Sequence, residues 1–301
     1  MKKEMLAIVN RAAGGGRAGK LYVAALDKLR ASGIKVDAVN TSGPGDASHL
    51  ARDGYAKGYR NFISVGGDGT GYEIVNGIFP EALHHSDRVA LGFLPLGTGN
   101  SFLRDFSKNG LQHATEALLT GKRRRCDVLK LTHAAGVLYY INLLSVGFTA
   151  DVTALANRRF KSLGEAGYIL AVLGSLMRLK RRAFPLRLDS AVEFDYDRCL
   201  FLTFNNSKYT GGKMMIAPKA ESDSGLIEYV RWGAIGRLAL LKYFPTLFDG
   251  THLNHPRASR SAATRIEFQL EGPIDVMVDG EVLTIQPKLL EVLPGALDVI
   301  A

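Results

Sequence analysis

The 301-residue sequence contains few of the features that mark secreted, metal-stabilised or membrane-spanning proteins. It has two cysteines, Cys126 and Cys199, and their spacing fits neither a disulfide framework nor a metal-binding pattern. No apolar run approaches the length needed to cross a bilayer. The basic N-terminus leads directly into a polar glycine loop, which argues against a signal peptide. These absences predict a cytoplasmic protein with reduced cysteines.

Acidic residues are the minority among the charged ones. The chain has 38 Lys and Arg against 29 Asp and Glu, a formal net charge of +9. This excess predicts an anionic partner: nucleic acid, a phosphorylated small molecule or an acidic membrane surface. Nucleic acid is the weakest of these, because the sequence shows no helix-turn-helix, zinc pattern or aromatic RNP-type strand. Internal repeats and low-complexity segments are also absent.

The first part of the chain alternates strand and helix patterns. Apolar runs at 6–10, 34–41, 62–65 and 89–97 predict strands, and helical spacing predicts helices over 21–32, 46–58 and 70–79. Asp46 is the expected N-cap of the second helix. Such alternation is typical of a doubly wound parallel sheet, a three-layer α/β domain that binds ligands beyond the carboxyl ends of its strands.

Strand patterns dominate after the basic run KRRR (Lys122–Arg125). We expect antiparallel strands at 127–133, 136–148, 186–192, 199–206, 226–232, 264–270, 274–280 and 289–295. Helical regions interrupt them at roughly 150–182 and 237–248. The predicted division is therefore an α/β domain over 1–126 and an antiparallel β-sandwich domain with inserted helices over 127–301.

Three strands of the first part end in glycine-rich loops: NRAAGGGRAGK (Asn10–Lys20), GGDGT (Gly66–Thr70) and LPLGTGNS (Leu94–Ser101). Glycines let the backbone approach a phosphate closely, and a following helix offers N–H groups. Asp68 would repel a phosphate unless Mg²⁺ lay between them. The alternatives are a tight turn with a solvent-facing Asp68, a turn capped by Asn100 or Ser101, and a flexible first loop. Neither the P-loop nor the GxGxxG spacing is present.

GGDGTGYEIVNG, followed by LPLGTGNSFLRDF, resembles the diacylglycerol kinase catalytic-domain family. This family includes bacterial lipid kinases, sphingosine kinases and ceramide kinases, and it shares its fold with NAD kinases and 6-phosphofructokinases. The opening IVNRAAGGGR, the segment TGGKMMIAP (Thr210–Pro218) and VDGE (Val278–Glu281) also match, so the resemblance covers nearly the whole chain. It implies an NAD kinase-like N-terminal domain.

The resemblance also implies roles for individual residues. Asp68 would act in catalysis by holding Mg²⁺ with the ATP phosphates, and Glu281 would be the general base. The implied nucleotide-binding residues are Asn10, Arg17, Thr41, Gly66, Gly67, Asp68, Gly69, Thr70, Glu73, Asn76, Gly97, Thr98, Gly99, Asn100 and Arg104. Some bacterial relatives hold a second, structural Mg²⁺ at a PxAxxxDG-like segment. This chain reads PKAESDSGL there and retains Asp223, which leaves that site in doubt.

Two acidic residues bear on the acceptor. The stretch SVGFTADV resembles sphingosine and ceramide kinases, in which an aspartate at the position of Asp151 contacts the lipid head group. A helix N-cap or first-turn charge is the alternative for Asp151. A base near an acceptor hydroxyl suits phosphoryl transfer. Without the resemblance, the Asp-Gly in VMVDGEVL would indicate only a hairpin beside Glu281.

We therefore predict an ATP- and Mg²⁺-dependent lipid kinase acting on a hydroxyl of diacylglycerol or a related long-chain lipid such as a sphingoid base or ceramide. The segment AGYILAVLGSLMRLKRRAF (Ala166–Phe184) and KRRR favour peripheral contact with an anionic membrane, although a core helix with a solvated basic end is the alternative. A homodimer is compatible with the sequence. The rival functions are a kinase of a soluble acceptor and a catalytically silent nucleotide-binding regulator.

Overall fold

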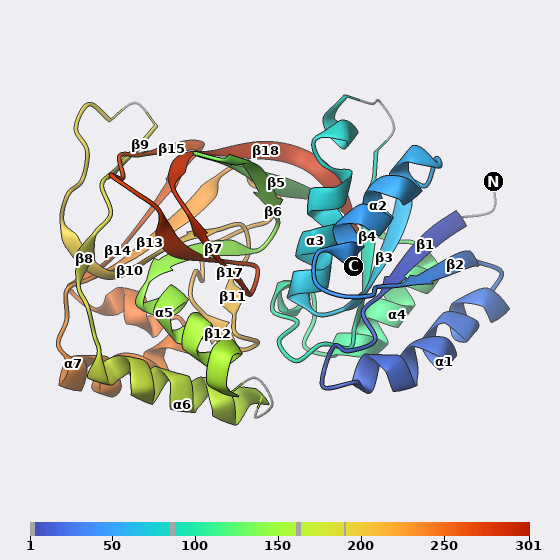
Figure 1. The fold of residues 1–301 in the computed structure, drawn as a ribbon, viewed down its shortest axis with the longest axis horizontal. Helices are drawn as coiled ribbons and strands as arrows, with labels where there is room; N and C mark the ends of the chain where they lie inside the picture. Colours follow the sequence, from blue (N-terminus) through green and yellow to red (C-terminus); the bar gives the residue numbers. More distant parts are fainter. Residues whose placement is uncertain (1–3, 85–87, 161–163, 190) are drawn as a thin grey trace. The chain divides into compact units, whose positions relative to one another are not determined.

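The chain forms two compact units in the computed structural model, which describes residues 4–84, 88–160, 164–189 and 191–301 (Figure 1). Unit 1 runs to Val128 and also includes Gly295–Ala301, and unit 2 is Leu129–Pro294. The chain passes between them within two strands, β5 (Arg123–His133) and β18 (Pro287–Ile300). The division expected at residue 126 lies close to this boundary. The C-terminal residues were expected in the second domain, but they return to unit 1.

Unit 1 is built on a parallel sheet with the strand order β2–β1–β3–β4. Its last strand position is filled by the end of β18, where Asp298–Ile300 pair in parallel with Ala90–Gly92. The strands are β1 (Glu4–Val9), β2 (Lys35–Asn40), β3 (Asn61–Gly66) and β4 (Ala90–Pro95). The helices are α1 (Arg17–Ala31), α2 (Asp46–Ala56), α3 (Asp68–Ile78) and α4 (Gly110–Thr120), with short 3-10 turns η1 (Glu81–Leu83) and η2 (Phe102–Asp105).

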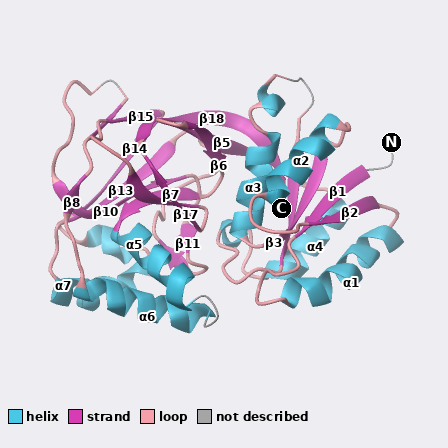
Figure 2. Cartoon of the chain, in the orientation of Figure 1, coloured by secondary structure: helices cyan, strands magenta, loops and turns pink. Residues whose placement is uncertain are grey.

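Helices cover both faces of this sheet, as the doubly wound prediction requires (Figures 1 and 2). Alternate β1 residues Met5, Ala7 and Val9 join the core beneath α1 and α4. On the other face α2 packs so closely on β1 that a Cβ at Gly54 would lie 2.4 Å from Leu6 Cδ2. The sheet is therefore held between two helical layers, with the carboxyl ends of β1, β3 and β4 leading into the three glycine loops.

Unit 2 is mostly antiparallel, as expected. One sheet has the order β14–β13–β10–β7–β16–β17, and the facing strands include the antiparallel pairs β5–β6, β15–β18 and β15–β9. Phe204 on β10 and Phe268 on β15 meet edge to face between the layers, with ring centroids 5.3 Å apart. The remaining bounds are β6 (Gly136–Tyr140), β7 (Leu143–Gly147), β8 (Arg182–Ala183), β9 (Leu186–Leu188), β10 (Arg198–Asn205), β11 (Tyr209–Thr210), β12 (Met214–Met215), β13 (Ile227–Gly233), β14 (Ala258–Ala263), β15 (Arg265–Phe268), β16 (Ile274–Val278) and β17 (Glu281–Ile285).

Helices of unit 2 pack on the outer face of the first of these sheets, around Phe201, Trp232 and Met277. The helical region expected over 150–182 is divided into α5 (Phe148–Leu155), a π-helical turn η3 (Ala156–Phe160) and α6 (Gly164–Met177). The second region becomes α7 (Arg237–Tyr243) and the 3-10 turns η5 (Phe244–Leu247) and η6 (Thr251–Asn254). None of the helices in the described ranges combines the length and apolar character that a bilayer crossing requires.

Candidate active site

The three glycine loops of unit 1 meet at the carboxyl ends of their strands. We call residues 10–17, 66–70 and 95–101 the glycine-loop cluster. Arg17 at the start of α1 donates from Nη2 to the Gly97 carbonyl oxygen at 2.7 Å. Gly14 has a φ of 62°, and a Cβ there would lie 2.4 Å from the Leu96 carbonyl oxygen. The first loop thus contacts the third directly. Both lie at the carboxyl ends of parallel strands, where such sheets bind ligands.

The second and third loops touch through their backbones. Gly97 N–H donates to the Gly66 carbonyl oxygen at 2.8 Å. A Cβ on Gly97 would lie 2.4 Å from Gly67 Cα, a distance that real Cβ contacts do not reach. Asn10 adds a longer contact of 3.4 Å from Nδ2 to Thr70 Oγ1. Residues without side chains at these positions leave backbone N–H groups open to approach by phosphate.

Asp68 is the first residue of α3, and its carboxylate binds the third loop. Oδ2 accepts a hydrogen bond from Ser101 N–H at 2.8 Å, and Oδ1 accepts one from Phe102 N–H at 3.3 Å. The half-buried carboxylate therefore caps η2 from another loop, and it is not the solvent-facing group of the tight-turn alternative. Burial raises the pKa of Asp68 above its usual range, although these N–H groups act in the opposite direction.

Asn100 shapes the third loop. It has a positive φ of 49°, and its Nδ2 donates to the carbonyl oxygens of Pro95 at 3.2 Å and Gly97 at 2.9 Å. Ser101 occupies the N-cap position of η2, as one alternative expected, but it makes no side-chain capping bond there. Thr98 and Gly99 are exposed between these contacts, and Arg104 lies half-buried in η2. Asn100 thus fixes the loop, while Thr98 and Gly99 remain accessible.

Three further nucleotide candidates lie on α3 and β2. Both carboxylate oxygens of Glu73 accept backbone hydrogen bonds, from Gly45 N–H at 2.9 Å and Ala47 N–H at 3.0 Å. Glu73 therefore holds the start of α2. Asn76 donates from Nδ2 to the Tyr72 carbonyl oxygen of its own helix at 2.8 Å. Thr41 follows β2 and binds the Val9 carbonyl oxygen through its backbone N–H.

The prediction that Asp46 caps α2 is wrong. Gly45 occupies the N-cap with a φ of 85°, and Asp46 is the first helical residue. Its carboxylate instead accepts hydrogen bonds from the N–H and hydroxyl of Ser42, which lower the pKa of Asp46. The capping function passes to Glu73, because a positive-φ glycine offers no side chain to the first turn. Sequence spacing within α2 could not reveal a cap that comes from α3.

Glu281 begins β17, directly after a tight turn at Asp279 and Gly280. These two residues have φ values of 47° and 92°, which suit a two-residue hairpin turn. Glu281 is exposed, and its carboxylate has no hydrogen-bond or ion-pair partner among the described residues. The hairpin alternative is thus correct, and it also presents a free carboxylate.

Asp279, which the sequence analysis did not select, holds this hairpin in place. Its buried carboxylate accepts hydrogen bonds from the N–H groups of Ile141, Asn142 and Leu143, at 3.2, 3.2 and 2.9 Å. These residues lead into β7, the neighbour of β16 in the sheet. An aspartate in an Asp-Gly turn is ordinarily explained by the turn alone. Only the partners of Asp279, which are distant in sequence, reveal its additional role.

Asp151 lies in the first turn of α5 and forms an ion pair with Arg182. Its Oδ1 accepts from Nη1 at 3.1 Å and Nη2 at 3.2 Å, and both side chains are partly exposed. The first-turn alternative is therefore met, with Gly147 as the N-cap. Oδ2 has no hydrogen-bond partner among the described residues, and the guanidinium already neutralises the carboxylate.

The residues fit one divalent cation better than two. Burial opposes the ionised form of Asp68, and a cation held with phosphates would offset that cost. Asp223 is exposed in a turn. The described part of the chain contains no cluster of three or more His, Cys, Asp or Glu residues suited to a metal. Support from this structure is thus confined to the Asp68 position.

Known proteins resemble this chain over nearly its whole length. Residues 4–131 match the diacylglycerol kinase catalytic domain model, and residues 142–301 match the YegS C-terminal NAD kinase beta sandwich-like domain model. A diacylglycerol kinase of Mycobacterium tuberculosis strain H37Rv is 30% identical over 301 residues, covering 99% of this chain and 94% of the relative. One from Bacillus subtilis strain 168 is 25% identical and covers 85% and 82%.

Solved structures support the fold. A crystal structure of a diacylglycerol kinase from Bacillus anthracis strain Sterne has a TM-score of 0.71 at 21% identity, covering 99% of this chain and 96% of that one. A second structure from this organism reaches a TM-score of 0.80 at 22% identity, covering 99% and 95%. The matched domains and the full-length relatives together show that this chain belongs to the diacylglycerol kinase family of lipid kinases.

Proposed function

We propose that this lipid kinase transfers the γ-phosphate of ATP to the free hydroxyl of diacylglycerol in a Mg²⁺-dependent reaction. The observation that carries the nucleotide part is the backbone contact between Gly97 and Gly67 within the glycine-loop cluster. The curated relatives named diacylglycerol kinase support the acceptor. The product would be a phosphatidic acid, which is a phospholipid.

The glycine-loop cluster supplies the phosphate site in this proposal. Exposed backbone at Thr98 and Gly99 and the N-terminal N–H groups of α1 and α3 suit an anion. Arg17 is exposed and has no carboxylate partner among the described residues, so its charge is available to ATP. Asp68 would hold Mg²⁺ together with the phosphates, and the ion would neutralise charge that develops during transfer.

Glu281 is the proposed base. In the transfer, the acceptor hydroxyl oxygen forms a bond to the γ-phosphorus while the bond to the bridging oxygen breaks. ADP leaves with that electron pair, and the hydroxyl proton passes to the Glu281 carboxylate. An exposed, unpaired carboxylate at a rigid turn suits this role, because no existing contact must break before it accepts a proton.

The acceptor is proposed to be neutral. Asp151 already carries the positive guanidinium of Arg182, so a cationic sphingoid base would compete with an existing ion pair. The uncharged glycerol hydroxyl of diacylglycerol can instead use the free Oδ2 as a hydrogen-bond acceptor. We further propose that the enzyme works in the cytoplasm and contacts the membrane peripherally, because its acceptor resides there.

The decisive experiment is radiolabelled ATP transfer into a total lipid extract, with identification of the labelled product and a parallel assay on NAD⁺. We expect label in phosphatidic acid and none in NADP⁺. Asp68→Asn should abolish transfer, and it should also lower stability by about 1–3 kcal/mol, because the amide opposes an N–H donor where Asp68 has an acceptor. Label in NADP⁺ alone, or ATP binding without transfer to any acceptor, would overturn the proposal.

A further inference from the structure

The helical side of unit 2 carries apolar side chains that the proposed chemistry does not use. Leu238 on α7 is 83% exposed and Met177 at the end of α6 is 78% exposed. Leu241 follows Leu238 by three residues and is also exposed, so the two share one face of α7. Leu240 between them is buried in the core, which fixes the outward direction of this pair.

The exposed residues of α6 and α7 are close in space. Arg237, which precedes Leu238, donates from Nη2 to the Met177 carbonyl oxygen at 2.8 Å. Figure 1 places both helices on the same side of the unit 2 sheet. We call Met177, Leu238 and Leu241, with the cations beside them, the α6–α7 surface. Isolated exposed leucines are common, but three gathered at one helix junction indicate an interaction site.

Cations border these apolar residues. Six exposed basic residues follow α6, lie on α7 or directly precede β14, and none forms an ion pair among the described residues. They are Arg178, Lys180, Arg181, Arg237, Lys242 and Arg257. The sequence segments 166–184 and 232–248 contain no acidic residue. This surface therefore combines apolar and basic residues, and the nearest acidic residue after the second segment is Asp249.

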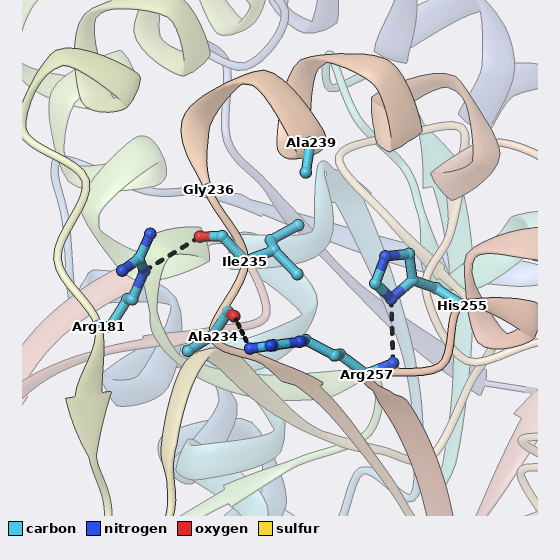
Figure 3. Close-up of a pocket in the computed structure, with 7 residues that line it drawn as sticks. All are labelled: Arg181, Ala234, Ile235, Gly236, Ala239, His255 and Arg257. Atoms are coloured by element: carbon cyan, nitrogen blue, oxygen red, sulfur yellow. Dashed lines mark hydrogen bonds between the residues drawn. The ribbon is translucent and has the colours of Figure 1, made fainter.

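A pocket of about 430 Å³ opens within the α6–α7 surface (Figure 3). Arg181 Nε donates to the Ile235 carbonyl oxygen at 3.1 Å, and Arg257 Nη1 donates to the Ala234 carbonyl oxygen at 2.6 Å. Each guanidinium has five N–H donors, so further donors remain for a ligand. His255 Nδ1 accepts from Arg257 N–H at 3.0 Å, which leaves Nε2 as the donor of a neutral ring. A pocket with two such arginines suits a phosphate group.

We propose that the α6–α7 surface docks the protein on an anionic phospholipid membrane, with a lipid headgroup phosphate in the pocket that Arg181 and Arg257 line. This inference rests on the proposed function, since a diacylglycerol kinase must reach an acceptor held in a bilayer. Leucine and methionine side chains flanked by lysine and arginine are the composition of surfaces that lie in the membrane interface. The positive charge matches the headgroups, and the exposed apolar tips match the acyl boundary.

The basic run Lys122–Arg125 is a weaker candidate for the same contact. Arg123 donates from Nη2 to Asn61 Oδ1 at 2.6 Å and pairs with Asp298 at 3.6 Å. Arg124 lies over the Phe106 ring, with Cζ 5.7 Å from its centroid. These residues are partly engaged within unit 1, and no strongly exposed apolar residue of the described chain is adjacent to them in sequence, as Leu238 is to Arg237.

Vesicle co-sedimentation without nucleotide tests the proposal on the full chain. We expect binding to vesicles of phosphatidylcholine mixed with phosphatidylglycerol, little binding to phosphatidylcholine alone, and release by salt. Arg178→Gln with Lys242→Gln should weaken binding about 25-fold, because each charge near an anionic surface contributes about fivefold. Leu238→Ser with Leu241→Ser should weaken it roughly tenfold. Matched controls are Val192→Ser, at another highly exposed apolar position, and Lys57→Gln, an exposed cation of unit 1.

A separate variant tests the headgroup pocket. Arg181→Gln with Arg257→Gln should remove the preference for phosphatidylglycerol, with thermal stability measured because both side chains also bind carbonyl groups. Within the described ranges, the Arg178 and Lys242 side chains make no such bonds, so that variant keeps the test valid if the pocket variant unfolds. Wild-type binding by both surface variants would overturn the proposal. So would calorimetric binding of inorganic phosphate by a protein that ignores vesicles, or docking by an acidic protein in place of lipid.

Activity assays separate this inference from the proposed function. Surface variants should phosphorylate diacylglycerol normally in detergent micelles and poorly in vesicles. If the wild-type protein binds vesicles but phosphorylates no lipid, the proposed lipid acceptor is refuted and the docking surface is not. If every variant transfers phosphate normally in micelles and also binds vesicles like the wild type, only the docking surface is refuted.

Discussion

The glycine-loop cluster of unit 1 and the Asp279–Glu281 hairpin of unit 2 expose their functional groups in opposite ways. The cluster depends on an absent side chain, since a Cβ on Gly97 would lie only 2.4 Å from Gly67 Cα. The hairpin depends on the Glu281 side chain, which is exposed on a turn that the buried carboxylate of Asp279 holds in place. The phosphate binding proposed for the backbone and the proton transfer proposed for the Glu281 carboxylate should therefore respond differently to substitution.

The sharpest test of this difference is Glu281→Gln, which should have the largest effect on turnover. Loss of a general base lowers kcat by about 10²–10⁴-fold. The side chain is exposed and unpartnered in the described structure, so thermal stability and ATP affinity should stay at wild-type values. Steady-state kinetics on diacylglycerol with differential scanning fluorimetry measures both. If the variant turns over at the wild-type rate, the general base is another residue. If it loses much stability, the Glu281 carboxylate also contributes to the fold.

In the glycine-loop cluster, a substitution should lower both stability and ATP affinity. Gly97→Ala forces a Cβ against Gly67 Cα and should cost about 1–3 kcal/mol of unfolding free energy. ATP affinity should fall with it, because Arg17 and Asn100 both bind the Gly97 carbonyl oxygen. Gly43→Ala is the matched control, since a Cβ there meets nothing within 4 Å. Calorimetric ATP titration and chemical denaturation provide the two measurements, and equal behaviour of the two variants would contradict the close-packing argument.

The sequence predicted the folding pattern of unit 1 well because strand and helix periods are local. It also identified the glycine loops after β1, β3 and β4, which meet because parallel strands bring their carboxyl ends to one edge. What it could not predict were the long-range hydrogen bonds. Asp68 binding the N–H groups of Ser101 and Phe102, and Glu73 binding the start of α2, join residues 26 to 34 positions apart.

The same reason explains the errors in unit 2. Strand β14 (Ala258–Ala263) has the sequence ASRSAA, whose small polar residues carry little strand signal, yet it pairs fully with β13. The last strand was expected to end at Gly295, but β18 continues to Ile300 because β4 offers an open edge. In both cases a neighbouring strand supplies the stabilisation, and no property of the segment itself reveals that neighbour.

An intermediate effect is expected from Asp279, which joins the two kinds of site. Asp279→Ala leaves three buried N–H groups without their acceptor and should cost about 1–3 kcal/mol or more. Turnover should also fall through displacement of Glu281, while the KM for ATP stays unchanged. Asp275→Asn is the control on the same hairpin, because Asp275 is exposed and binds only the Thr284 hydroxyl in the described structure. A variant that loses stability but keeps full kcat would show that Asp279 does not position Glu281.

The smallest effect concerns acid stability and should be confined to unit 2. His252 is fully buried, with Nε2 3.1 Å from the Ile216 carbonyl oxygen and its ring 5.8 Å from Trp232. Burial lowers the pKa of His252 below its usual range. The unfolded chain therefore takes up a proton near pH 6.5 that the folded unit resists, and stability falls as pH decreases below that value.

Trp232 is the single tryptophan of the chain, so its fluorescence reports unfolding of unit 2. His252→Gln should remove a pH slope of up to about 1.4 kcal/mol per pH unit below pH 6.5, because glutamine does not titrate. His49→Gln, at an exposed position on α2 of unit 1, should leave that slope intact. Equal slopes in the wild type and His252→Gln would assign the acid sensitivity of unit 2 to other groups.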